Sequence, residues 1–207
     1  MKLSKKLPDI LLESFFIVIA LLGALALDEW REDKEKMELA DSAKHAIIEE
    51  IKDNKKQLDS KLPVHQDMLK LLNEKLEYFK KTGNTDANFD FSFSMAIITS
   101  AAWDTARMTQ SAQFMTFDEV RNFSKVYKFQ ELYVEHQQKL IEMIMQIGDL
   151  EDDEFPHFTK GFVHRLELLI EINEMLSETY GKLDEAELSK KVTGDIEKVE
   201  HQDNNDS

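Results

Sequence analysis

The apolar stretch close to the N-terminus constrains this chain more than any other feature of its sequence. Residues 7–27 include only two charged side chains, Asp9 and Glu13. As an α-helix these 21 residues would be about 31 Å long, at ~1.5 Å per residue, which matches the hydrocarbon core of a bilayer. The sequence therefore predicts a transmembrane helix over residues 7–27, preceded by a basic tail at residues 1–6.

The charges on either side of this stretch set its expected orientation. Lys2, Lys5 and Lys6 precede it, whereas acidic residues predominate directly after Leu27. Because positively charged flanks stay in the cytoplasm, we expect a single-pass protein of the bacterial cytoplasmic (inner) membrane, with the N-terminus inside and the bulk of the chain extracytoplasmic. Trp30 lies about one turn beyond the apolar stretch, where an indole would act as an anchor at the outer interface.

A cleaved secretory signal is the alternative interpretation of the same residues. Ala24-Leu25-Ala26 has the A-x-A form of a cleavage site. Asp9 and Glu13 disfavour this alternative, because they interrupt the basic and apolar regions of a signal peptide. Both interpretations export the remainder of the chain.

One face of the predicted membrane helix has the composition of an association surface. Glu13, Ile17, Ala20 and Ala24 fall on the same side of a helix. Small residues and polar groups are how membrane helices associate, so we expect self-association or docking on a partner helix. The alternative for Glu13 is a snorkelling or protonated carboxyl near the inner headgroups, since a charge within a bilayer is costly.

Residues 13–30 (ESFFIVIALLGALALDEW) resemble the start of a group of small, single-pass bacterial membrane proteins of unknown function. In that group a glutamate opens the span, small residues interrupt it, and a tryptophan follows in an acidic or amide-rich stretch. Residues 102–106 (AWDTA) and the later pair Val126-Tyr127 are similar to that group as well. The resemblance implies a membrane location and a helical exported region, and it implies no activity.

Composition narrows the class of the exported part. The first 27 residues carry a net charge of +1, so residues 28–207 carry −16 of the total of −15. Such acidity disfavours nucleic acid as a partner. The chain has no Cys, six Gly and three Pro, which indicates a fold without disulfides and with long helices. We therefore predict an all-α protein, in which the transmembrane helix continues into an extracytoplasmic antiparallel helical bundle at residues 28–200.

Apolar periodicity and turn residues predict the individual helices. The first extends from the anchor to Pro63, which ends or kinks it, and a second follows on residues 68–79. Residues 88–94 alternate apolar and polar side chains, which favours an extended loop that places phenylalanines in the end of the bundle. We expect the later helices at residues 95–109, from a capping box at Thr116 and Glu119 to about Gly148, from Phe155 to Gly181, and at 188–199, before a disordered tail at residues 201–207. The helix from Phe155 carries the clearest heptad-like apolar stripe, which consists of Phe155, Phe158, Phe162, Leu166, Leu169, Leu176 and Tyr180.

Three large side chains stand out in the exported part. Trp103 is surrounded by small residues and is expected to anchor the bundle core, with ligand stacking as the alternative. Gln130 and Gln137 interrupt an apolar stripe, so they either set the register of the bundle or reach its edge.

The sequence offers only weak candidates for a metal or catalytic site. His157, His164 and Glu167 could in principle bind a metal, but two helical turns separate the histidines. His45 and Glu49 are four residues apart on a strongly charged helix, where a solvated contact is the better explanation. We predict no catalytic, cofactor or metal site and no enzyme activity.

These observations favour a non-enzymatic interaction or scaffold module held at a membrane. Its expected partners are membrane lipid and either a second copy or a partner membrane protein, with no nucleic acid. The alternative is a sensor-like, ligand-binding helical module that signals through a partner. An unrecognised hydrolase is a more distant possibility.

Overall fold

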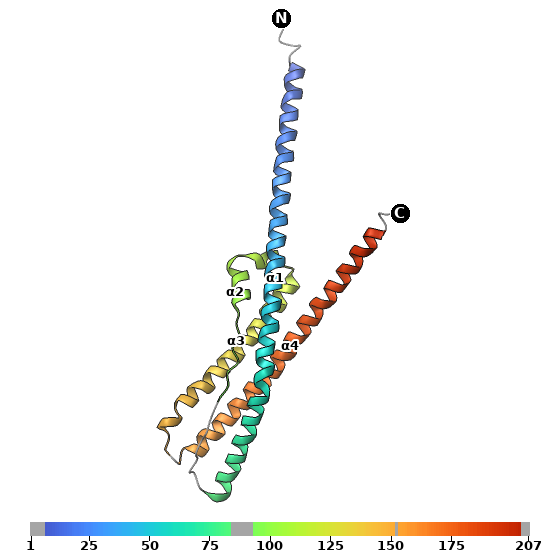
Figure 1. Cartoon of the computed structure of the whole chain (residues 1–207). Coiled ribbons are helices and arrows are strands. Elements are labelled where there is room, and N and C mark those ends of the chain that lie inside the picture. Colours follow the sequence, from blue (N-terminus) through green and yellow to red (C-terminus); the bar gives the residue numbers. More distant parts are fainter. Residues whose placement is uncertain (1–6, 84–92, 152, 204–207) are drawn as a thin grey trace.

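The computed structural model of the protein describes residues 7–83, 93–151 and 153–203, with side chains over residues 12–83, 93–151 and 153–183. These residues form helices and no strand, so the all-α prediction is confirmed for the described part of the chain. The elements are α1 (Leu7–Thr82), α2 (Ala101–Met108), the 3-10 turn η1 (Ser111–Phe114), α3 (Phe117–Met145), the 3-10 turn η2 (Ile147–Asp149) and α4 (Phe155–Asp203) (Figure 1).

Helix α1 is continuous from the predicted membrane segment to the far end of the molecule. Its 76 residues extend about 114 Å at ~1.5 Å per residue. The N-terminal part of α1 stands free of the other helices (Figure 1), and the first buried side chain among the described residues is Ala40. The sequence predicts that Pro63 ends or kinks the first helix. This residue lies inside α1, so the prediction that the helix ends there is wrong.

The helix α4 supports α1 next to Pro63. Proline has no backbone N–H, so it cannot donate to the carbonyl of Asp59, one turn earlier. Beside that position the Asn173 amide donates to the Leu58 carbonyl at 3.2 Å, and the Ser177 hydroxyl donates to the Asp59 carboxylate at 2.5 Å. These tertiary contacts favour a continuous helix at a residue that would otherwise interrupt it.

The helices α1 and α3 run in the same direction. Lys44 of α1 pairs with Glu119 near the start of α3, with 3.5 Å between Nζ and Oε1. Further along both helices, the Asn54 amide donates to Gln130 at 3.1 Å. Residue numbers therefore rise together on the two helices, and this parallel pair differs from the predicted antiparallel arrangement.

Helix α4 runs antiparallel to α1. The contact of Ser177 with Asp59 is followed by one between Gln66 and Glu174, whose side chains are 3.4 Å apart. The residue numbers of α4 thus fall as those of α1 rise. In Figure 1, α4 crosses α1 and then diverges from it toward the C-terminus.

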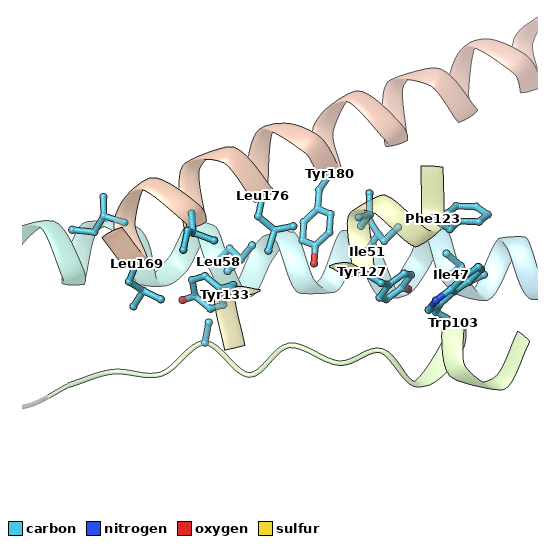
Figure 2. Close-up of a cluster of buried hydrophobic side chains, with 14 of the residues drawn as sticks. Ile47, Ile51, Leu58, Trp103, Phe123, Tyr127, Tyr133, Leu169, Leu176 and Tyr180 are labelled. Atoms are coloured by element: carbon cyan, nitrogen blue, oxygen red, sulfur yellow. The ribbon is translucent and has the colours of Figure 1, made fainter. Parts of the chain in front are cut away.

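A single hydrophobic core lies between these helices. The core-facing side of α4 follows the predicted stripe, of which Phe155 and Phe158 are half-buried. The other five members, Phe162, Leu166, Leu169, Leu176 and Tyr180, have no exposed area. Figure 2 shows three of them, Leu169, Leu176 and Tyr180, meeting side chains from the other three helices. The residues labelled there from α1, α2 and α3 are Ile47, Ile51, Leu58, Trp103, Phe123, Tyr127 and Tyr133.

An extended segment, residues 93–100, leads into α2 and replaces half of a predicted helix. The helix expected over residues 95–109 covers only Ala101–Met108. The capping box of α3 is confirmed, with Thr116 accepting from the backbone N–H of Glu119. The expected extended loop at residues 88–94 lies outside the described residues except for Phe93 and Ser94, which belong to no helix or strand.

Two predictions at the C-terminal end are wrong. Helix α4 passes through Gly181 and includes the separate helix expected at residues 188–199. A glycine inside a helix costs only about 1 kcal/mol relative to alanine. The contacts that α4 makes elsewhere outweigh this cost. Residues 201–203 of the predicted tail continue α4, residues 204–207 lie outside the described part, and the disorder of the tail stays a prediction.

Candidate functional site

Side-chain amides hold the extended segment through its backbone. Gln137 of α3 accepts a hydrogen bond from the Ala96 N–H at 2.9 Å and donates to the Ala96 carbonyl at 3.1 Å. Asn54 of α1 bonds Thr99 in the same two-fold manner, at 3.0 Å from the N–H and 2.7 Å to the carbonyl. Each amide therefore supplies the donor and acceptor that a neighbouring β-strand would offer.

Gln130 links these contacts to α4. Its Nε2 donates to the Thr99 carbonyl at 2.8 Å, and its Oε1 accepts from Asn54 at 3.1 Å and from the Tyr180 hydroxyl at 2.6 Å. Both Gln130 and Asn54 are buried. Burial raises the pKa of Tyr180, so its hydroxyl keeps the proton that it donates. We call Asn54, Gln130, Gln137 and Tyr180 the amide clamp.

The N-terminal end of the extended segment contacts a buried histidine. His65 of α1 lies with Nε2 at 2.8 Å from the Ser94 carbonyl. Its ring stacks on Phe93, with 5.1 Å between ring centres and 8° between ring planes. No sequence pattern singles out His65, because a lone histidine on an apolar face has no distinctive spacing.

A carboxylate of α1 holds the start of α2. Glu50 accepts from the Ala102 N–H at 3.0 Å and from the Tyr127 hydroxyl at 2.6 Å. Burial, and next the hydrogen bond to Glu50, raise the pKa of Tyr127. Trp103 lies directly after this contact and stacks on Tyr127 with 5.7 Å between ring centres. The indole is 6% exposed, so it belongs to the packed core described above.

The predicted association face lies on the free part of α1. Glu13, Ile17 and Ala20 line one shallow hollow of that helix, together with two neighbouring apolar side chains, whereas Ala24 is exposed one turn further on. Trp30, the predicted interface anchor, is 63% exposed.

Over the side chains that the structure describes, which begin at Leu12, no helix offers a stretch both long and apolar enough to cross a membrane. The predicted transmembrane helix is therefore not confirmed.

The histidines considered as metal ligands do not form a metal site in the described residues. His157, His164 and Glu167 line the same hollow of about 920 Å³ between the end of α1 and the start of α4. Among the described residues, no three or more His, Asp or Glu side chains are placed close enough together to hold a metal ion. His45 and Glu49 are exposed on α1, where Glu49 pairs with Lys52 at 3.1 Å.

No family model, curated protein or solved structure with which the chain was compared matches it.

Replacing Gln137 by Met tests the amide clamp. Methionine has a similar volume but cannot bond the Ala96 backbone, and each buried polar group left unpaired costs about 1–3 kcal/mol. We expect the free energy of unfolding to fall by roughly 2–4 kcal/mol in urea titrations. Gln138→Met is the matched control, because Gln138 is exposed on the same helix and should change stability little. Equal effects of the two changes would contradict the clamp.

Replacing Trp103 by Ala tests whether the indole anchors the core. A buried tryptophan truncated to alanine typically costs about 3–5 kcal/mol of unfolding free energy. Trp30→Ala, at the exposed tryptophan, should change stability by less than about 0.5 kcal/mol. A Trp103→Ala protein with unchanged stability would favour the ligand-stacking alternative.

Proposed function

We propose that this chain is a membrane-anchored interaction or scaffold module, with its N-terminus in the cytoplasm and its helical core outside it. The exposure of the apolar part of α1 is the observation that carries the proposal. Every large apolar side chain from Leu12 to Leu27 is 49–64% exposed. A contiguous apolar surface of this size calls for lipid or a partner to cover it. The proposed span also includes residues 7–11, whose side chains lie outside the described part.

A rigid stalk would hold the core at a set distance from the bilayer. Helix α1 has no break between Leu27 and Ala40, and 13 residues of helix correspond to about 20 Å. Ion pairs one turn apart favour helix in this charged stretch. They join Arg31 to Asp28 and Glu35, Lys34 to Glu38, and Lys36 to Glu32 and Asp33.

The proposed association face is accessible to a partner helix. From Glu13 to Ala40 is 27 residues, which is about 7.5 turns at ~3.6 residues per turn. The side of α1 that carries Glu13, Ile17 and Ala20 is therefore opposite the side that packs into the core. A second copy or a partner membrane protein could pack there without meeting the rest of this chain.

The proposed role is non-enzymatic and needs no cofactor. The charge of −16 on residues 28–207 supports partners other than nucleic acid. We also propose kinship with the small single-pass bacterial membrane proteins that residues 13–30 resemble. A sensor-like, ligand-binding role is the second candidate, and the feature that favours it is a groove of about 600 Å³ between α2 and α3, beside Trp103 and Tyr127.

Cysteine labelling tests the proposed topology, because the chain has no cysteine of its own. Ser60→Cys should react with a membrane-impermeant maleimide in cells with a permeabilised outer membrane, since Ser60 is exposed and lies on the part of α1 that we propose to be extracytoplasmic. Ser4→Cys, in the basic tail, should react only after the inner membrane is broken. The opposite pattern would contradict the proposal, and a mature N-terminus at Leu27 would establish the cleaved signal instead.

Bulky residues on the proposed association face should weaken pairing. Ala20→Leu with Ala24→Leu prevents close approach of two helix backbones, so a two-hybrid assay in membranes should give a lower signal. The loss should be modest, because polar contacts between membrane helices average only about 0.6 kcal/mol. Val18→Leu, on the other side of the helix, is the control. If the double variant and the control pair equally well, this face contacts only lipid.

A further inference from the structure

His65 has no exposed area, and its two ring nitrogens have unequal surroundings. A carbonyl oxygen only accepts hydrogen bonds, so the contact of 2.8 Å with Ser94 requires the proton on Nε2. Nδ1 is buried and has no hydrogen-bond partner among the described groups. In the neutral ring Nδ1 carries no proton, and protonation would place an N–H there with nothing to accept it.

The surroundings of His65 oppose a positive charge. Burial lowers the pKa of His65, the bond to Ser94 works against this shift, and the cation of Lys61 on the same helix adds to it. The extended segment contributes the uncharged ring of Phe93. On α4, the Glu174 carboxylate bonds Gln66, the residue after His65, rather than the imidazole.

We propose that His65 is an acid-sensitive latch that holds the extended segment against α1. Protonation of its ring would break the stack on Phe93 and the bond to Ser94, because a charged imidazole with an unpaired N–H leaves the apolar core for water. The amide clamp contains no group that titrates near neutral pH, so Ala96 and Thr99 stay bound. The released part is therefore the end of the segment at residues 93–94.

The direction of the pH effect follows from proton uptake. A histidine whose pKa is lowered by burial binds its proton more readily in the released state than in the latched state. The latch is therefore fully closed above the ordinary histidine pKa of about 6.5 and weakens as the pH falls below it.

Thiol labelling of the full chain in lipid nanodiscs tests the latch. Ser94→Cys should be labelled slowly at about pH 7.5 and faster at about pH 5.5, relative to Ser60→Cys, which corrects for thiolate content. The relative rate should rise by up to about tenfold per pH unit, the limit for uptake of one proton. His65→Gln keeps a donor for the Ser94 carbonyl but does not titrate, so it should abolish this rise. His136→Gln should retain the rise, because His136 lies on α3 and bonds the Leu132 carbonyl of its own helix.

Three results would overturn the proposal. One is a relative labelling rate that does not change with pH, and another is the same rise in the His65→Gln chain. The third uses the unaltered histidine and does not depend on the variant folding. The ring of His65, followed by NMR, should titrate in parallel with labelling, and a midpoint unrelated to it would exclude His65 as the switch.

Discussion

The backbone of residues 93–100 needs hydrogen-bond partners that no helix or sheet provides, and much of this fold depends on how they are supplied. Buried N–H and C=O groups are almost always paired, because an unpaired one loses its bonds to water without replacement. Here Asn54 and Gln137 each bind both polar groups of one residue, at Thr99 and Ala96. The two amides come from different helices, so α1 and α3 must lie side by side for the segment to fit between them.

The parallel course of α1 and α3 follows from this arrangement. A chain that leaves the far end of α1 must return before it can run in the same direction again, and the extended segment leads the chain toward the start of α2. Glu50 then fixes the beginning of α2, and the core closes when Tyr180 of α4 donates to Gln130. Polar contacts thus set the register of a core that apolar packing stabilises.

Local signals in the sequence predicted the parts of the fold that depend on neighbouring residues. The capping box at Thr116 and the stripe from Phe162 to Tyr180 concern spacings of three to seven residues, and both are found in the structure. The membrane segment and its association face come from the same kind of reasoning and remain proposals.

The sequence could not predict features that depend on distant contacts. Ala96 and Thr99 have no strong preference against helix, and they are extended because amides from α1 and α3 bind their backbone. Pro63 would end an isolated helix, yet α1 continues beside the donors of α4. The apolar periodicity is interrupted at Gln130 and Gln137, but the sequence does not show that these amides bind the backbone of Thr99 and Ala96. Partners some 30 to 40 residues away in the sequence leave no local pattern.

Amide hydrogen exchange at Ala96 and Thr99 tests whether side-chain amides hold the extended segment. Both N–H groups lie outside any helix, and we expect them to exchange as slowly as buried helical amides, because opening them requires Gln137 or Asn54 to leave the core. In the Gln137→Met protein the amide of Ala96 should lose more protection than that of Thr99. Exchange at both positions as fast as in an exposed loop would contradict the claim that side-chain amides hold this segment.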